Sequence, residues 1–210
     1  MTPLRIDVVS DVICPWCFIG ARRLDQALKE QPEIDATIVY RPYQLDPTTP
    51  PEGTDLRERL RKKYGADPEQ MFGRVEAAAR ETGIPLDFAK VRRTFATLPA
   101  HTLLRHAIAK GTQPGLKESL FSAYFLEGRD LGNPAVLAEV AARHGFSAEE
   151  TARILGDSQE LATTRDEAAA LSAEGIQGVP YFIFGGRVAF SGAQPLEVFR
   201  SALQQAARPQ

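Results

Sequence analysis

The sequence predicts an α/β protein whose strands lie near the two ends of the chain. Alternating apolar residues indicate a strand close to the N-terminus, and a glycine pair between two short strand-like runs indicates a hairpin within residues 178–192. Between these stretches, roughly 120 residues show the three-to-four-residue spacing of helices. Both ends of the chain are therefore expected to build a sheet, with a helical segment between them.

The N-terminal stretch predicts a strand, a helix and a second strand. Apolar residues at positions 4, 6 and 8 alternate with their neighbours, which is the two-residue period of a strand. Ile19, Leu24 and Leu28 then recur at helical spacing, and residues 36–45 alternate again. Such a unit is expected to be right-handed, with its two strands parallel.

The middle of the chain predicts helices only. Residues 46–53, DPTTPPEG, are rich in proline and glycine and predict a linker. Helical patterns then cover residues 56–64, 68–82, 102–109, 116–126 and 159–173. Asn133 before Pro134 indicates the start of one further helix, and Ser147 with Glu150 forms the capping box of another.

The C-terminal stretch predicts two strands and a helix. In GVPYFIFGGRVAFSG, Gly185 and Gly186 suit the positive φ angles of a two-residue hairpin connection, and a last helix is expected over residues 195–206. The complete order predicts a thioredoxin-like fold with an inserted all-helical domain. We expect residues 1–46 and 176–210 to form the thioredoxin-like core and residues 47–175 to form the insertion.

Composition and charge narrow the classes of function. The chain has 210 residues, 43% of them hydrophobic, which is enough for an ordinary core. Its 25 basic and 27 acidic side chains leave a formal charge of −2, so neither nucleic acid nor an anionic membrane is an expected partner. Residues 1–16 lack the basic and apolar regions of a signal peptide, and we therefore expect a cytoplasmic protein.

The only two cysteines, Cys14 and Cys17, fall on the predicted strand-to-helix turn. A structural disulfide is disfavoured because so short a loop restrains the unfolded chain little and the cytoplasm is reducing. A structural zinc site would need a second cysteine pair or spaced histidines. His101 and His106 are interpreted as surface or core-edge residues and His144 as a helix-end residue, so no metal is expected. The cysteines therefore indicate a redox dithiol.

A helix start favours a thiolate, because its unpaired N–H groups carry partial positive charge. Cys14 is thus predicted to be the nucleophile, and Cys17, one turn later, to resolve the mixed disulfide. Pro15 suits the first helical position, whether or not it also contacts a substrate. Trp16 is expected to be partly exposed as an apolar contact for a substrate, the alternative being that it packs on the inserted domain.

Two further features allow two interpretations each. Asp11 could accept a proton or tune the thiolate, and it could equally be a turn-forming aspartate. The basic run at residues 56–65 is interpreted mainly as a solvated helix face, with contact to an anionic substrate as the alternative.

Four segments carry a resemblance to a known family. They are DVICPWCFIG at residues 11–20, RPYQLDP at 41–47, AHTLLRHA at 100–107 and GVPYFIFGGRVAFSGAQ at 178–194. Through these four segments, the chain resembles the DsbA-like thiol–disulfide oxidoreductases, in particular their FrnE-type cytoplasmic branch. The related 2-hydroxychromene-2-carboxylate isomerases and kappa-type glutathione transferases typically carry a serine where this chain has Cys14.

The resemblance implies a cis peptide bond at Val179–Pro180 that faces the cysteines. A proline at this place leaves the Val179 backbone free to pair with an extended substrate segment, whereas an ordinary edge-strand proline is the alternative. By the same resemblance, residues 191–194 are expected near the site, with Gly192 allowing a close approach. Cys14, Cys17 and Pro180 are the expected catalytic residues, and Pro15, Trp16, Val179 and Gly192 the expected substrate-binding residues.

The expected function is that of a thiol–disulfide oxidoreductase that reduces or isomerises disulfides in proteins or small molecules. We expect no tightly bound cofactor, and a low-molecular-weight thiol such as glutathione as co-substrate. Trp16 cannot donate a charged hydrogen bond to Cys14, so a milder lowering of the thiol pKa and a less oxidising couple than in DsbA are expected. The sequence does not predict an oligomeric state.

Two other interpretations remain open at this stage. One is a glutathione-dependent isomerase or transferase acting on an aromatic small molecule, in which Cys14 activates a bound thiol cofactor. Another is a non-catalytic binding module, in which the helical insertion docks a partner or the cysteines hold a metal. The resemblance also places some members of this branch in aromatic polyketide biosynthesis, which is consistent with a small-molecule substrate.

Overall fold

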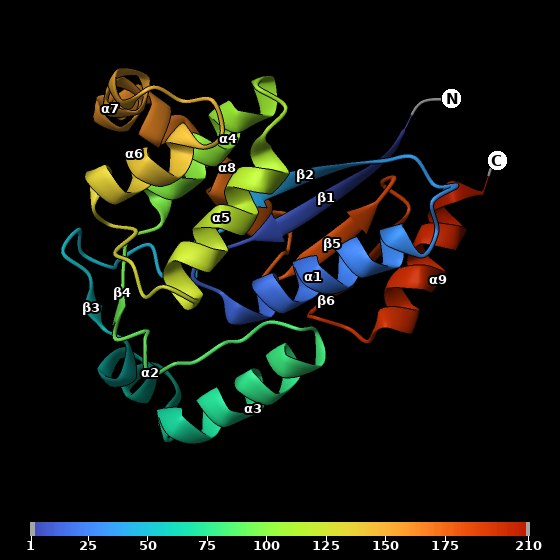
Figure 1. Ribbon diagram of the computed structural model, residues 1–210, viewed down its shortest axis with the longest axis horizontal. Helices are drawn as coiled ribbons and strands as arrows, with labels where there is room; N and C mark the ends of the chain where they lie inside the picture. The colour runs from blue at the N-terminus through green and yellow to red at the C-terminus, as the bar shows by residue number, and fades with distance from the viewer. Residues whose placement is uncertain (1–2, 209–210) are drawn as a thin grey trace.

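The computed structural model describes residues 3–208, and its main sheet joins the two ends of the chain (Figure 1). The four strands lie in the order β2 (Ala36–Pro42), β1 (Leu4–Ser10), β5 (Tyr181–Phe184) and β6 (Val188–Ser191). β1 pairs in parallel with β2 and antiparallel with β5, and β5 pairs antiparallel with β6. The predicted thioredoxin-like fold is confirmed.

Helices α1 (Pro15–Lys29) and α9 (Leu196–Ala207) pack side by side on this sheet (Figure 1). Gly20 lets α1 lie very close to β5. A Cβ atom at Gly20 would lie 2.9 Å from the ring of Phe182 and 3.2 Å from Cγ of Pro180. A glycine in the second turn of α1 therefore brings the start of this helix against the segment that contains Pro180.

Seven helices occupy the middle of the chain. They are α2 (Leu56–Tyr64), α3 (Pro68–Glu81), α4 (Leu98–Ala109), α5 (Gln113–Phe125), α6 (Pro134–Ala142), α7 (Ala148–Gly156) and α8 (Ser158–Ala173). In Figure 1, α4 to α8 gather beside the β2 edge of the sheet, while α2 and α3 form a separate group below it. The division of the chain after residues 46 and 175 stays a prediction.

Two short strands lie within this segment, and the expectation that it holds helices only is wrong in this respect. β3 (Thr54–Asp55) pairs antiparallel with β4 (Arg93–Thr94). A two-residue strand is too short to show a period-two alternation, so its sequence carried no signal. Among the helices described in residues 3–208, none has both the length and the apolar character needed to cross a membrane.

The predicted helix starts are confirmed where a capping side chain is present. The Asn133 side chain accepts from the N–H of Ala135, and Ser147 Oγ accepts from the N–H of Glu150 at 3.0 Å. By contrast, α4 begins at Leu98 rather than at residue 102, and α5 at Gln113 rather than at residue 116. Both helices carry a proline in their first turn, where its missing N–H needs no partner.

The C-terminal hairpin turns through Gly185 and Gly186, whose φ angles are 57° and 68°. Positive φ at both glycines was expected. Because Phe184 pairs with Val188, however, the connection spans residues 185–187, and the predicted two-residue connection is wrong. The N–H of Arg187 donates to the carbonyl of Phe184 at 3.1 Å and closes the turn.

Aromatic packing fixes the helical segment against the first turns of α1. The ring of Phe18 stacks on Phe121 at a centroid distance of 4.9 Å and lies 6.0 Å from Phe125. On the other face of the sheet, Val9 packs with Leu171 and Ile176. The start of α1 is therefore held between the sheet and α5.

Candidate active site

Cys14 is the residue that immediately precedes α1, and Pro15 occupies the first turn of the helix. Its backbone is extended, with φ −92° and ψ 112°. The Cys14 carbonyl accepts the N–H groups of Cys17 at 3.0 Å and Phe18 at 3.3 Å. Cys14 thus has the N-cap geometry in which the partial positive charge of the helix start lies next to its side chain.

The structure brings Cys14 together with Val179 and Pro180, from the other end of the chain. The Cys14 thiol donates to the carbonyl oxygen of Val179 at an Sγ–O distance of 3.7 Å. The Val179–Pro180 bond is cis, and the Pro180 side chain is buried. Gly192 lies next to Pro180, since the Gly192 N–H donates to the Pro180 carbonyl at 2.8 Å. The φ angle of Gly192 is 82°. Gly192 does not line the cavity beside Cys14.

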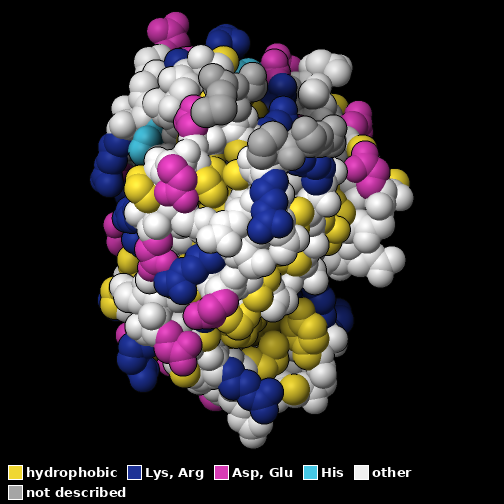
Figure 2. All heavy atoms as spheres, turned by 90° about the vertical axis from the view of Figure 1, so that its right-hand side faces the viewer, with side chains coloured by type: hydrophobic (Ala, Val, Ile, Leu, Met, Phe, Trp, Pro, Cys, Tyr) yellow, Lys and Arg dark blue, Asp and Glu magenta, His cyan; other side chains and the backbone are white. Residues whose placement is uncertain are grey.

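A cavity of about 200 Å³ opens beside Cys14, between the start of α1 and helices α2 and α3. Pro15, Trp16 and Val179 also line it, and the Trp16 side chain is 39% exposed. Its apolar walls include Ile13, Leu56, Phe72, Val75, Phe88 and Phe125. Figure 2 shows a hollow with gathered hydrophobic side chains at the height of α3. Trp16 therefore faces the same cavity as residues of α2 and α3 and is also open to a ligand.

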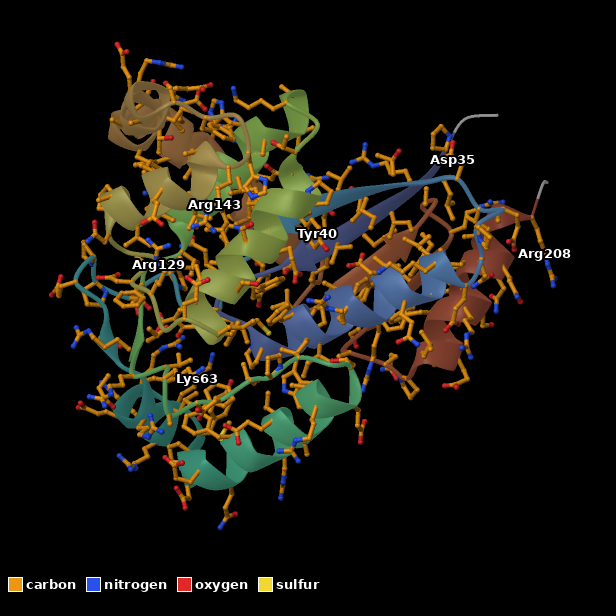
Figure 3. The ribbon with its side chains drawn as sticks, viewed as in Figure 1. Asp35, Tyr40, Lys63, Arg129, Arg143 and Arg208 are labelled. Atoms are coloured by element: carbon orange, nitrogen blue, oxygen red, sulfur yellow. The ribbon has the colours of Figure 1, made fainter. Side chains whose placement is uncertain are left out.

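Basic side chains of α2 reach the same cavity. Arg59 and Lys63 line it, and a neighbouring hollow of about 540 Å³ shares both residues and Leu45. The Arg59 guanidinium bonds Asp46 at 3.0 Å, and Lys63, labelled on α2 in Figure 3, donates to the Leu45 carbonyl at 3.3 Å. Part of the basic run at residues 56–65 thus lines the cavity beside Cys14 and does not only face solvent.

The two thiols are buried and interact with each other. Cys14 is 4% and Cys17 1% exposed, and they are not joined by a disulfide. The hydrogen bond with Cys17 and burial raise the pKa of Cys14. Burial opposes ionisation of Cys17, but the hydrogen bond from Cys14 and the charge of Lys117 outweigh it and lower the pKa of Cys17.

The lowered pKa expected for Cys14 is therefore wrong for the unreacted dithiol. The helix start does favour a thiolate, but the neighbouring Cys17 thiol and burial outweigh this effect and raise the pKa of Cys14. Cys14 must therefore lose its proton before it can attack a disulfide.

Two buried, hydrogen-bonded side chains, Asp11 and His101, lie next to the dithiol. Oδ1 of Asp11 is 3.1 Å from Nε2 of His101, and Oδ2 accepts the N–H of Leu45 at 2.8 Å. Burial favours the neutral carboxyl, but these hydrogen bonds and the charge of Lys117 lower the pKa of Asp11. His101, interpreted from sequence as a surface or core-edge residue, is fully buried, and burial lowers its pKa.

Sequence reasoning missed Lys117, a buried lysine of α5. Its side chain is 1% exposed, and its charge acts on Cys17, Cys14 and Asp11. The available signal was its place four residues before Phe121 and seven before Tyr124, on the apolar face of the helix. Within residues 3–208, no three His, Cys, Asp or Glu side chains are grouped so that they could hold a metal ion.

Comparisons with known proteins agree with this architecture. A family profile described as the DSBA-like thioredoxin domain matches residues 5–204. The Bacillus subtilis protein YwbO is 26% identical over 209 residues, covering 95% of this chain and 96% of YwbO. A probable DsbA oxidoreductase from Streptomyces coelicolor superposes with a TM-score of 0.89 at 30% identity, covering 99% of this chain and 92% of that one.

A more distant structure was solved with a ligand. The cytosolic disulfide reductase DsbM from Pseudomonas aeruginosa, solved with glutathione, superposes with a TM-score of 0.64 at 20% identity. The match covers 96% of this chain and 98% of DsbM. At this identity, DsbM is similar to the chain in fold.

Proposed function

Because this chain belongs to the DSBA-like thioredoxin domain family, we propose that it is a thiol–disulfide oxidoreductase whose reacting groups are Cys14 and Cys17. One observation carries the proposal. Cys14 lies at the start of α1, opens into an apolar cavity and is 3.7 Å from the Val179 carbonyl oxygen. A helix start beside a cavity is the kind of microenvironment in which a cysteine reacts.

The reaction proceeds in two exchanges. The Cys14 thiolate attacks one sulfur of a substrate disulfide, forming a mixed disulfide and releasing the other sulfur as a thiolate. The Cys17 thiolate then attacks Cys14 Sγ, so that the Cys14–Cys17 bond forms and the bond from Cys14 to the substrate breaks. The substrate gains two electrons and leaves as two thiols once protonated, while the protein is oxidised to its disulfide.

The order of attack follows from access. Cys14 lines the cavity, whereas Cys17 does not and is 1% exposed. A substrate disulfide in the cavity can therefore meet the Cys14 sulfur but not the Cys17 sulfur. Loss of the Cys14 proton prepares the first attack, and loss of the Cys17 proton prepares the second.

The residues around Cys14 are proposed to bind the substrate. An extended segment beside Cys14 would pair with the Val179 backbone, and Pro180 carries no N–H that competes for it. Trp16 and Pro15 offer an apolar surface on the opposite side of Cys14. Gly192 supports this arrangement from behind through its bond to the Pro180 carbonyl.

The size of the cavity favours a small-molecule disulfide or a single side chain of a protein substrate. A volume of about 200 Å³ is below the usual range for drug-sized ligands, so a folded protein would insert only part of itself. A low-molecular-weight thiol such as glutathione is proposed to return the disulfide to the dithiol. The DsbM structure with glutathione supports this choice of co-substrate.

We place the protein among reductases or isomerases of disulfides rather than strong oxidants. Trp16 supplies no charged hydrogen bond to a Cys14 thiolate, and the thiols are buried, so the reduced form gains less stabilisation than in DsbA. A cytoplasmic location, where the glutathione pool is reducing, fits this direction. A titration of the Cys14/Cys17 couple in glutathione buffers gives its reduction potential and so tests this direction.

A second candidate is a glutathione-dependent isomerase or transferase. Its supporting observation is the apolar cavity with Arg59 and Lys63 beside Cys14, which could hold an aromatic substrate that carries an anionic group. In that reaction Cys14 would activate a bound thiol, and Cys17 would be dispensable. Turnover of a conjugated aromatic substrate that survives Cys17→Ala would favour this candidate.

The proposal is tested by insulin-disulfide reduction in the presence of glutathione. Cys14→Ser replaces the nucleophilic sulfur by a hydroxyl of similar size, and we expect reduction to fall to the uncatalysed rate. Ser201→Ala, an exposed change on α9, is the control and should leave the rate unchanged. Undiminished activity of a folded Cys14→Ser variant would reject the proposal.

A further inference from the structure

Lys117 is a buried lysine that no ion pair explains. Among the residues that the structure describes, 3–208, its Nζ has no hydrogen-bond partner, although its side chain is 1% exposed. Nζ lies 4.7 Å from the ring centroid of Phe121 and 5.5 Å from that of Tyr40. Contact with two aromatic faces offsets only part of the free energy that an ammonium loses when it leaves water. Burial of this charge therefore disfavours folding.

The position of Lys117 is fixed relative to the dithiol. Phe121, one turn further along α5, stacks on Phe18, which follows Cys17 in sequence. Tyr40 belongs to β2 and is labelled beside α5 in Figure 3. The side-chain amide of Gln113, at the start of α5, bonds both the N–H and the carbonyl of Tyr40 at 2.9 Å. These contacts fix the ammonium against the aromatic rings that pack on Phe18, the residue after Cys17.

The titratable groups around Lys117 come from four elements. They are Cys17 in α1, Cys14 and Asp11 in the turn before it, His101 in α4 and Tyr40 in β2. Asp11 already carries a negative charge, which His101 and Leu45 stabilise through hydrogen bonds. A thiolate adds a second negative charge to the same buried region, where charges interact far more strongly than in water.

We propose that Lys117 is a positioning residue for the dithiol, whose buried ammonium is the counter-charge that keeps one thiol of the Cys14/Cys17 pair ionised. With the Lys117 ammonium, the group made of Asp11, Lys117 and two thiols is neutral, and formation of one thiolate gives it a single negative charge. Without the ammonium, formation of the same thiolate would give the group two negative charges. The inference rests on the proposed function only in naming the reacting pair.

The charges of Lys117 and the thiols act on each other in both directions. Burial lowers the pKa of Lys117 to about 8, while the charges of Cys17, Asp11 and Cys14 oppose that effect. The Lys117 charge in turn lowers the pKa of Cys17. Such coupling is reciprocal, so conversion of the dithiol to its disulfide must make Lys117 lose its proton more easily.

The variant Lys117→Met tests this role, because methionine keeps an unbranched side chain of similar length but carries no charge. The rate of thiol alkylation by iodoacetamide is measured from pH 5 to pH 10. We expect the midpoint of the pH profile to rise by about one unit, which slows alkylation about tenfold at neutral pH. The equilibrium with glutathione should also move toward the Cys14–Cys17 disulfide, because the reduced form loses stabilisation.

Lys29→Met is the matched control, since Lys29 is exposed at the far end of α1. Its alkylation profile should coincide with that of the wild type. Lys117→Met should also unfold at a higher urea concentration than the wild type, because a buried charge has been removed. A folded Lys117→Met protein with the wild-type pH profile would overturn the inference.

A second measurement needs no variant and no substrate. The pKa of Lys117 is followed in the wild-type protein through its Cε and Nζ resonances, once as the dithiol and once as the disulfide. We expect a lower pKa in the disulfide form, and equal values in both forms would overturn the inference. A clear shift in a protein that fails to reduce any disulfide would reject the proposed function and leave the role of Lys117 intact.

Discussion

The Cys14 thiol lies 3.7 Å from the carbonyl oxygen of Val179, which is 165 residues away along the chain. Cys14 immediately precedes α1, and Val179 precedes β5, so the site forms only when the two ends of the chain share a sheet. Contacts between α1 and β5 should therefore control both the stability of the fold and the reactivity of the cysteine. One of these contacts is at Gly20, which faces Phe182 in β5.

Gly20→Ala is predicted to destabilise the protein by roughly 1–3 kcal/mol, because overpacking of a close contact forces neighbouring groups to move. The added Cβ would lie 2.9 Å from the Phe182 ring and 3.2 Å from Pro180 Cγ. The free energy of unfolding in urea, followed by circular dichroism, measures the loss. Displacement of Pro180 should also slow disulfide reduction.

Gly73→Ala is the matched control for this substitution. Gly73 lies within α3, and an added Cβ there meets no heavy atom within 4 Å. Alanine should therefore stabilise the protein by roughly 0.5–1 kcal/mol through its higher helix propensity. Equal effects of the two substitutions would show that the contact between α1 and β5 is not tight.

Trp16→Ala is predicted to raise the KM for a small disulfide about fivefold while kcat stays within about twofold. Trp16 lines the cavity next to Cys14, and loss of one aromatic contact of about 1 kcal/mol weakens substrate binding. Steady-state kinetics separate the two constants. Ile108→Ala removes an exposed apolar side chain outside the cavity and should change neither. A fall in kcat at constant KM would show instead that Trp16 orients the thiol.

Acid is predicted to destabilise the fold in part through His101. Burial keeps the folded pKa of His101 below the unfolded value of 6.5, so the unfolded chain binds more protons below that pH. The free energy of unfolding should therefore fall as the pH drops below about 6.5, by up to about 1.4 kcal/mol per pH unit for one proton. Asp11, whose folded pKa is also lowered, adds a further loss at still lower pH.

His101→Gln isolates this contribution, because an amide can still donate to Asp11 but does not titrate. The difference in unfolding free energy between wild type and variant should shrink as the pH falls from about 6.5 to 4.5. Denaturant titrations at several pH values measure it. A pH-independent difference would mean that His101 has the same pKa in the folded and unfolded states, which contradicts the prediction.

Much of the fold could be predicted because its signals are local. Alternation in residues 4–8, the side-chain caps Asn133 and Ser147, and the paired glycines at 185 and 186 each act within a few residues. The first turns of α4 and α5 were missed because a proline within the pattern was not used as a start signal. β3 and β4 are too short for any periodic signal.

The site could be predicted only where one segment carries it. The cysteine pair and the Val179–Pro180 pair each lie within a few residues and match a known family. Asp11, His101 and Lys117 come together from three parts of the chain, and their effect depends on burial and mutual distance. A single sequence gives neither quantity, so the direction of the pKa shift at Cys14 could not be predicted from it.

The assignment of Cys14 as the nucleophile and Cys17 as the resolving thiol is tested most directly by trapping the mixed disulfide. The Cys17→Ala protein is incubated with excess glutathione disulfide, and its intact mass and cysteine peptides are measured. We expect one stable glutathione adduct on Cys14, whereas the wild type should end as the Cys14–Cys17 disulfide without an adduct. Absence of an adduct in Cys17→Ala, or equally fast formation of one on Cys17 in Cys14→Ala, would contradict the assignment.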